Sequence, residues 1–150
     1  MLEKNRFKIP VAPHLILLKG DQVLLHLRQN TGYADGMYSL VAGHLEGGES
    51  ILQAMIREAR EEANIEIDPT DLSVNCTMHR WSRSGEEYIY LYLICRRWKG
   101  QLRNREPEKC KELQFHPLDN LPSNLLPAVR RGIECALNEI SYCEYGWEEK

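Results

Sequence analysis

The sequence predicts an α/β fold of the α+β kind, in which a mixed β-sheet is flanked by helices. Short apolar segments separated by turn residues are typical of strands joined by hairpins. Two longer segments, 50–64 and 125–140, instead repeat apolar residues with helical spacing. The chain has 150 residues, the size of one ordinary domain, so we expect a single domain over residues 1–150.

Six segments have the length and composition of strands. They are residues 14–19, 22–28, 37–42, 73–81, 87–98 and 113–117. Gly20 and Asp21 separate the first two, and residues 82–85 separate the fourth and fifth, so each pair is expected to form a hairpin. Residues 29–36 are rich in turn formers, and residues 43–48 contain three glycines in six positions. Both are therefore predicted to be loops.

The first predicted helix begins after Ser50 and ends near Asn64. Ser50 and Gln53 have the spacing of a capping box, and Asn64 can end the helix in a left-handed conformation. The apolar stripe of this helix consists of Leu52, Ile56, Ala59 and Ala63. The second helix is predicted over residues 125–140, where Pro127 is tolerated in the first turn.

The composition excludes several classes of protein. Hydrophobic residues make up 43% of the chain and charged residues 27%, which is typical of a globular protein. A formal net charge of -3 provides no basic excess for a nucleic-acid clamp. No apolar run approaches the ~20 residues of a membrane helix, and residues 1–10 lack the apolar region of a secretory signal. We therefore expect a cytoplasmic domain without a membrane anchor.

The five cysteines indicate no disulfide framework and no zinc site. They are Cys76, Cys95, Cys110, Cys135 and Cys143. None forms the close-spaced pair that a structural zinc site needs. We expect free, mostly buried thiols in a reducing compartment.

Three carboxylates gather on one face of the first helix. Glu58, Glu61 and Glu62 fall within an arc of roughly 100°, away from the apolar stripe. Like charges at this spacing repel each other by a few tenths of a kcal/mol per pair. A hard divalent cation such as Mg²⁺ or Mn²⁺ removes that penalty, because it binds oxygen ligands. An acidic run alone is usually a solvated surface, so its neighbours decide the interpretation.

Those neighbours suit chemistry on a phosphate anhydride. Metal-assisted attack of water needs carboxylates that hold the metal and a loop of little bulk that admits the phosphates. Gly43, Gly47 and Gly48 offer that access. Arg57 can form an ion pair with Glu49 or Glu61 and so fix the loop to the helix.

Residues 43–65 resemble the Nudix box, G-x5-E-x7-R-E-U-x-E-E-x-G-U, where U is aliphatic. The matching residues are Gly43, Glu49, Arg57, Glu58, Ala59, Glu61, Glu62 and Ile65. Asn64 stands where the box has its late glycine, and asparagine is the next-best residue for a left-handed helix end. The resemblance is specific within the box and weaker along the rest of the chain.

The resemblance implies a fold and an activity. Nudix hydrolases are α/β/α sandwiches that cleave a nucleoside diphosphate linked to a group X, using Mg²⁺ or Mn²⁺. By position, Glu58 and Glu62 would be the principal metal ligands, and Glu61 a further ligand or the base that activates water. Glu49 would support the metal site and pair with Arg57. The implied catalytic residues are thus Glu49, Arg57, Glu58 and Glu61, and the implied metal ligands are Glu58, Glu61 and Glu62.

Two further contributions to the metal site are implied. The backbone carbonyl near Ala42 or Gly43 could face a metal ion. Many members of the family also use an acid that follows the box. Glu106, Glu108 and Glu112 are the candidates, and the sequence does not choose among them.

The residues that select the substrate lie mostly outside the box. Arg28, Gly43 and His44 are the candidate substrate-binding residues. The alternating Tyr88, Tyr90 and Tyr92 either present a ring to a base or pack a helix against the sheet. The aromatic tail 142–147 could pack on the core, cover the pocket or contact a partner chain.

The segments 106–110 and 118–122 resemble family members that hydrolyse nucleoside triphosphates, including MutT-like enzymes. About a dozen residues precede the first predicted strand. These are too few to form the extra N-terminal sheet that many ADP-ribose hydrolases carry. Hydrolysis of a (d)NTP to NMP plus pyrophosphate is therefore the first hypothesis, and a nucleotide sugar such as ADP-ribose is the alternative substrate. A Nudix module that binds nucleotide or RNA without catalysis is the alternative of another class, although all four box glutamates are present. The protein could be a monomer or a homodimer.

Overall fold

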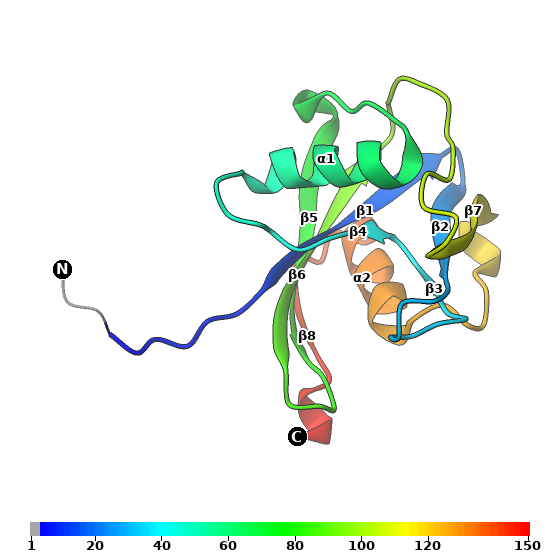
Figure 1. Cartoon of the computed structure of the whole chain (residues 1–150). Coiled ribbons are helices and arrows are strands. Elements are labelled where there is room, and N and C mark those ends of the chain that lie inside the picture. The colour runs from blue at the N-terminus through cyan, green and yellow to red at the C-terminus, as the bar shows by residue number, and fades with distance from the viewer. Residues whose placement is uncertain (1–3) are drawn as a thin grey trace.

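The computed structural model describes residues 4–150 (Figure 1). The strands are β1 (Val11–Lys19), β2 (Gln22–Arg28), β3 (Tyr38–Ser39), β4 (Val41–Ala42), β5 (Leu72–Trp81), β6 (Glu87–Cys95), β7 (Cys110–Pro117) and β8 (Tyr142–Tyr145). The helices are α1 (Ile51–Ala63) and α2 (Pro127–Leu137). Short 3-10 turns occupy Pro69–Asp71, Leu118–Asn120 and Trp147–Glu149.

The strands form one mixed sheet with the order β3-β2-β1-β6-β5-β8, and β4 and β7 add to β1 and β2. β1 pairs antiparallel with β2 and β4 but parallel with β6. β5 pairs antiparallel with β6 and parallel with β8. The two expected hairpins, β1–β2 and β5–β6, are both present, so the predicted mixed sheet is confirmed.

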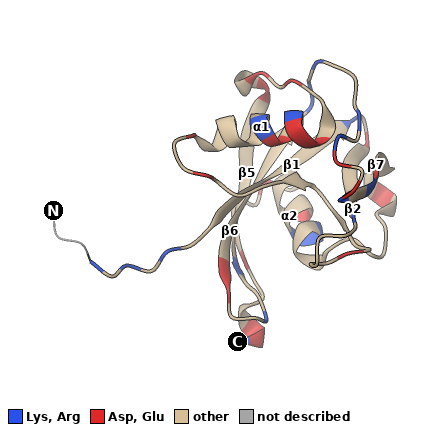
Figure 2. Cartoon of the chain, viewed as in Figure 1, with Lys and Arg blue, Asp and Glu red and all other residues tan. Residues whose placement is uncertain are grey.

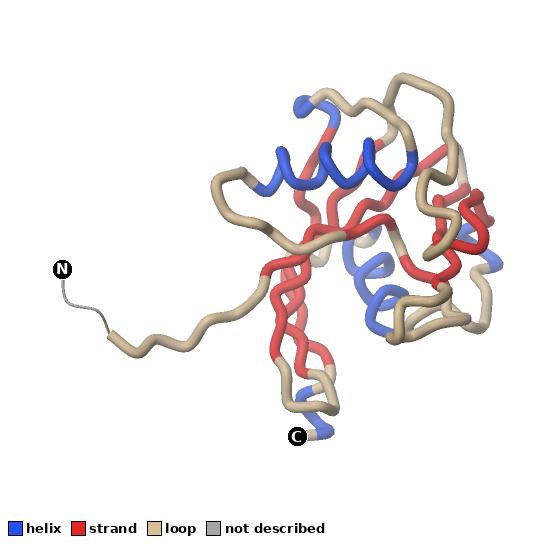
Figure 3. Tube along the Cα trace, in the orientation of Figure 1, coloured by secondary structure: helices blue, strands red, loops and turns tan. Residues whose placement is uncertain are grey.

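Helices cover both faces of the sheet, with α1 on one side and α2 on the other (Figures 1 and 3). Successive side chains of a strand point to opposite faces. Accordingly, Leu15 and Leu17 of β1 belong to the buried cluster that includes Met55 of α1. Ile16 of the same strand belongs to the cluster that includes Ile133 of α2. The α/β/α sandwich is therefore confirmed, and β1 is mostly apolar because both of its faces are covered.

Both ends of α1 follow the sequence prediction. Ser50 Oγ accepts a hydrogen bond from the backbone N–H of Gln53, and Gln53 Oε1 accepts one from the N–H of Ser50. At the other end Asn64 adopts φ 63° and ψ 28°, which is the left-handed conformation. The departure from glycine at this position therefore leaves the turn intact.

Some element boundaries differ from the prediction. The expected strand 37–42 is divided into β3 and β4, because Ser39 pairs with β2 whereas Ala42 pairs with β1. The expected helix 125–140 begins at Pro127 and ends at Leu137. Leu126 is not helical, because the ring of Pro127 disfavours the helical conformation in the residue before it. β6 ends at Cys95 rather than at 98, and β7 begins at Cys110 rather than at 113.

The aromatic tail packs on the sheet. Its residues 142–145 form β8 beside β5, and the Trp147 indole N–H donates to the His79 carbonyl at 2.9 Å. Trp147 also contacts the ring of Trp81. The sequence left three roles open for the tail, and the structure shows it packing on the core. The tail also reaches the rim of a cavity described below.

All five cysteines lie within the described residues and are free and buried, as expected. No helix in residues 4–150 is long and apolar enough to cross a membrane. Residues 1–3, part of the segment in which the sequence shows no secretory signal, lie outside the described range.

Candidate active site

The glycine-rich loop and helix α1 meet where Gly43 faces Glu58. A Cβ atom built on Gly43 would lie 2.2 Å from Oε1 and 2.3 Å from Cδ of Glu58. The Glu58 carboxylate therefore lies directly against the loop backbone, which only a residue without a side chain permits. The sequence suggests access for phosphates as the reason for Gly43, and the structure adds this packing reason.

Arg57 is surrounded by carboxylates. Its Nε and Nη2 donate to the two oxygens of Glu49 at 3.0 and 2.8 Å, a bidentate contact. Its Nη1 donates to Glu58 at 2.7 Å and to Glu61 at 3.3 Å. Glu46 Oε1 lies 3.7 Å from Nη2. Arg57 thus ties the loop to the helix and holds two of the predicted metal-binding acids.

The charges of this cluster stabilise one another. The Arg57 guanidinium lowers the pKa of the Glu49 carboxyl, and Glu49 in turn is the main cause that raises the pKa of Arg57. The neighbouring carboxylates therefore favour the charged form of Arg57. Figure 2 shows the resulting pattern, in which acidic and basic residues share the second half of α1 while its first half carries no charge.

Glu62 is the buried member of the acidic set, with a side chain only 10% exposed. Its Oε2 is covered and has no hydrogen-bond partner among the described residues. Burial raises the pKa of Glu62 well above 4.5, and the nearby Glu58 and Glu106 raise it further, whereas the Ala42 backbone N–H lowers it. A buried carboxylate oxygen without a partner is costly, so this atom needs a ligand when the residue is charged.

His26 lies beside Glu62. Its Nδ1 is 3.5 Å from Glu62 Oε1, and its Nε2 is buried without a partner among the described residues. The residue comes from β2, which lies in the sheet between β3 and β1. His26 is therefore placed to orient the Glu62 carboxylate.

Glu61 differs from its neighbours because its side chain is 54% exposed. The structure thus separates the three acids of the helix by environment. Glu62 is buried, Glu58 is held between Arg57 and Gly43, and Glu61 faces solvent.

Among the three acids after the box, Glu106 is the one that approaches the site. It lines a cavity of about 360 Å³ together with Glu58, Glu62, His26 and Lys109. Glu108 is exposed, and its backbone carbonyl accepts a bond from Asn30. Glu112 accepts a bond from the Tyr38 hydroxyl at 3.1 Å and lies outside that cavity.

These residues fit a hard divalent cation, which binds carboxylate oxygens. The unpartnered Glu62 Oε2 supplies one buried oxygen, and Glu58 and Glu106 are the acids beside it. The oxygens of these three residues do not all lie within 4.8 Å of one another. For these three residues to bind one cation, at least one of their side chains must therefore rotate. The cavity of about 360 Å³ that they line leaves room for this rotation.

A larger cavity of about 1020 Å³ opens from the acidic site and shares Glu62, Ala42, His26 and Arg28 with the smaller one. Its lining combines rings, cations and the start of α2. The residues used below are His14, His44, Arg80, Tyr33, Tyr88 and Tyr90. A cavity of this size, lined by aromatic, charged and apolar side chains beside an acidic cluster, is the default candidate for a small-molecule site.

A family model described as the NUDIX domain matches residues 8–136, most of the chain and all of the acidic site. The chain belongs to the Nudix hydrolase family. The predicted resemblance over residues 43–65 is thereby confirmed.

Curated relatives cover most of this Nudix chain. The NAD-capped RNA hydrolase NudC of Pseudomonas aeruginosa is 41% identical over 124 residues, which are 80% of this chain and 40% of the relative. The human 8-oxo-dGDP phosphatase NUDT18 is 30% identical over 127 residues, 83% of this chain and 36% of the relative. The chain thus spans about 40% of the length of the relatives it matches.

Solved structures show the same fold at low identity. A MutT NUDIX hydrolase from Burkholderia pseudomallei aligns with a TM-score of 0.78 and 23% identity, covering 86% of this chain and 98% of the other. A bifunctional NMN adenylyltransferase/ADP ribose pyrophosphatase from Francisella tularensis, complexed with AMP and Mn ion, aligns with a TM-score of 0.70 and 21% identity. It covers 92% of this chain and 44% of the other.

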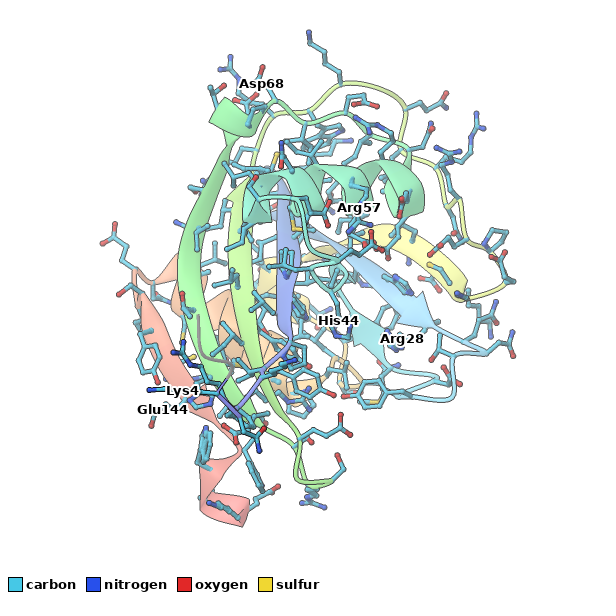
Figure 4. The ribbon with its side chains drawn as sticks, turned by 60° about the vertical axis from the view of Figure 1, so that its left-hand side comes forward. Lys4, Arg28, His44, Arg57, Asp68 and Glu144 are labelled. Carbon is cyan, nitrogen blue, oxygen red and sulfur yellow. The ribbon has the colours of Figure 1, made fainter. Side chains whose placement is uncertain are left out.

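The three predicted substrate-binding residues of the Nudix chain all line the large cavity. In Figure 4, Arg57 is labelled on α1, His44 in the loop before it and Arg28 at the end of β2. Arg28 also donates to the Tyr33 carbonyl and to Thr31, so it holds the loop 29–36 as well as facing the cavity. His44 lies in the loop with its ring stacked near Tyr88, at a centroid distance of 6.1 Å.

The tyrosine stripe is divided between packing of the helix and lining of the cavity. Tyr92 is fully buried, and its hydroxyl donates to the Ala128 carbonyl of α2, so it packs the helix on the sheet. Tyr88 and Tyr90 line the cavity instead. Gly132 of α2 lies directly against the Tyr92 ring, whereas Tyr90 is only partly buried and packs against the buried cluster to which Tyr92 belongs.

Sequence reasoning missed His26 and Arg80. A histidine within the apolar run of β2 was the available signal for His26, but its closeness to Glu62 depends on the position of β2 in the sheet. Arg80 gave no signal, because an arginine near a strand end is usually solvated.

Proposed function

We propose that this Nudix chain hydrolyses a nucleoside diphosphate linked to a group X with Mg²⁺ or Mn²⁺, and that the substrate is a (d)NTP converted to NMP plus pyrophosphate. The observation that carries this proposal is the buried Glu62 with its unpartnered oxygen, beside Glu58 and Glu106 and at the mouth of a nucleotide-sized cavity. Such an oxygen is costly in a merely structural helix.

Three acids are assigned to hold the cation, namely Glu58, Glu62 and Glu106. When bound, a hard divalent cation neutralises phosphate oxygens and lowers the pKa of coordinated water. Glu61, the exposed acid, is assigned as a further ligand or as the acceptor of the proton that the attacking water loses. Glu49 and Arg57 keep the loop and Glu58 in place.

The loop and the cavity position the substrate. Gly43 leaves room for the diphosphate beside Glu58, and Arg28 and His44 are placed to contact phosphate or sugar oxygens. The nucleoside then lies in the large cavity against Tyr88 and Tyr90. Five free thiols accord with a reducing compartment, and we propose the cytoplasm.

A second candidate substrate is a dinucleotide such as NAD or a nucleotide sugar such as ADP-ribose. Two similarities favour it, because the Pseudomonas relatives are NAD-capped RNA hydrolases and the Francisella protein is an ADP ribose pyrophosphatase. A domain that only binds nucleotides is disfavoured, because the chain keeps all four box glutamates.

The test is a product analysis with Mg²⁺ and with Mn²⁺. The panel contains dNTPs, NTPs, NAD and ADP-ribose, and Glu61→Gln accompanies the wild type. The triphosphate proposal expects release of pyrophosphate and NMP, with a rate lowered on the order of 10²-fold by the substitution. Turnover of ADP-ribose or NAD alone overturns the triphosphate assignment, and the absence of any turnover overturns the hydrolase assignment.

A further inference from the structure

The large cavity extends well beyond the acidic site to Arg80 on β5. The hydrogen bonds of the Arg80 guanidinium come from Nη1, which donates to the hydroxyl of Tyr90 at 2.6 Å and to that of Tyr33 at 3.4 Å. Its Nε is buried and has no partner among the described residues. Both hydroxyl partners are neutral phenols, so no negative counter-charge is in contact with this partly buried cation among residues 4–150.

Tyr90 holds one side of the Arg80 guanidinium. Its guanidinium carbon lies 5.3 Å from the centroid of the Tyr90 ring, in a cation–π contact. Another neighbour of that ring is His14, at a centroid distance of 4.4 Å. Tyr90 therefore holds the guanidinium by both its face and its hydroxyl, and the Nε–Nη2 edge with its two parallel N–H groups is left without an acceptor. A buried donor without an acceptor is unfavourable, so a group that supplies acceptors gains affinity there.

The backbone of Arg80 lies three strands away from the acidic site. From Ala42 beside Glu62, the sheet passes through β4, β1 and β6 before it reaches β5. Three strand spacings amount to roughly 14 Å. The group that Arg80 contacts therefore belongs to the part of the substrate remote from the reacting phosphate.

We propose that Arg80 is a specificity-determining binding residue that recognises two adjacent hydrogen-bond acceptors at the remote end of the substrate, through Nη2 and, after a tilt of the side chain, Nε. The O6 and N7 atoms of a guanine-type purine form such a pair and are the usual partners of arginine. A second oxyanion on the substrate offers the same chemistry. The inference rests on the proposed function only in taking the substrate to be a nucleotide.

His14 supports the purine source. Its Nδ1 lies 2.9 Å from the Ala12 carbonyl, and burial lowers its pKa to about 4, so the ring is neutral near pH 7. With Nδ1 donating to the carbonyl, Nε2 is an acceptor. The cavity thus combines a donor from Arg80 with an acceptor from His14, both beside Tyr90, which suits a base that carries both acceptors and N–H donors.

The test measures ligand binding without catalysis, by calorimetric titration in a buffer that contains Mg²⁺. The ligands are GMP, AMP and adenosine 3′,5′-bisphosphate. The variants are Arg80→Met, which keeps the apolar stem, and Arg80→Lys, which keeps the charge but not the planar fork. The control is Arg131→Met, an exposed arginine of α2 that pairs with Glu134 at 3.6 Å. Thermal unfolding of each variant verifies that it is folded.

We expect Arg80→Met to weaken GMP binding on the order of 10-fold to 100-fold and AMP binding by less than about three-fold. Arg80→Lys should recover little of the GMP affinity. A selective loss of the bisphosphate instead identifies an oxyanion as the source of the acceptors. Equal changes for all three ligands, or changes no larger than those in Arg131→Met, overturn the assignment.

These outcomes are independent of the hydrolase proposal. If GMP binding depends on Arg80 but no nucleotide is hydrolysed, the subsite stands and the proposed activity fails. If nucleotides are hydrolysed and neither GMP nor bisphosphate binding depends on Arg80, the activity stands and this inference fails.

Discussion

The backbone of Gly43 and the carboxylate of Glu58 are in direct contact, and any Cβ at position 43 would lie 2.2 Å from Glu58 Oε1. This contact joins the first residue of the box to an assigned metal ligand. It also explains why the glycine is needed although its φ is not in the left-handed region. The constraint comes from the side chain opposite and not from the backbone conformation.

Gly43→Ala should therefore lower activity much more than stability. The conflicting atoms belong to the end of a flexible side chain, so Glu58 can move away at a cost of about 1 kcal/mol or less. Displacement of a metal ligand, however, costs about 10²-fold in rate. Steady-state kinetics and urea unfolding of the same preparation measure both effects.

Gly132→Ala is the matched control for that experiment. Its Cβ would lie 2.1 Å from Cζ of Tyr92, a fully buried ring that cannot move aside. We expect a loss of about 1–3 kcal/mol in the free energy of unfolding and a nearly unchanged rate per folded molecule. If the two variants lose activity only in proportion to stability, the Gly43–Glu58 contact has no specific role.

Arg57→Lys should lower kcat/KM by roughly 10-fold or more. Lysine keeps the charge but cannot make the bidentate contact with Glu49 while also bonding Glu58. Arg60→Lys is the control on the same helix, because Arg60 makes an exposed pair with Glu66 away from the cavities. Equal rates in the two variants contradict the positioning role of Arg57.

Glu62→Gln should stabilise the metal-free protein, and more so at pH 8 than at pH 5. Burial raises the folded-state pKa of Glu62 above 4.5, so the folded protein binds more protons than the unfolded chain between these two pKa values. The stability that this group contributes is complete below pH 4.5 and is lost as pH rises through the folded pKa. Urea unfolding of wild type and variant at each pH, in the presence of a chelator, measures the difference in their free energies of unfolding. If this difference becomes smaller as pH rises, the burial assigned to Glu62 is contradicted.

The three acids after the box should differ in effect. Glu106→Gln should lower the metal-dependent rate by about 10-fold or more, because Glu106 lies with Glu58 and Glu62 in the smaller cavity. Glu108→Gln and Glu112→Gln change an exposed residue and a partner of Tyr38, so their rates should stay within about two-fold of the wild type. A large loss in Glu112→Gln with none in Glu106→Gln reverses the choice. The assay is initial rate against Mg²⁺ concentration.

The parts of the site that the sequence predicts are those within one continuous segment. The cap of Ser50 and Gln53, the left-handed Asn64 and the shared face of Glu58, Glu61 and Glu62 follow from helical geometry alone. The contact of Arg57 with Glu49 follows from the same short range.

The remaining parts depend on packing between distant segments. Which of the three downstream acids reaches Glu62 is decided by the path of the loop before β7, and the closeness of His26 by the position of β2. The separation of Tyr92 from Tyr90 depends on the contact of Tyr92 with α2. No spacing rule in the sequence carries this information, because strand alternation gives all three tyrosines the same face.

The central claim is that Glu62, with its buried unpartnered oxygen, holds the cation on which hydrolysis depends. The most direct measurement is the rate of nucleoside monophosphate release as a function of Mg²⁺ concentration, for wild type and for Glu62→Gln in parallel. We predict that the wild-type rate saturates with Mg²⁺ and vanishes with chelator, while the folded variant is slower by on the order of 10²-fold. A folded Glu62→Gln protein with the wild-type rate and the same dependence on Mg²⁺ would contradict the account.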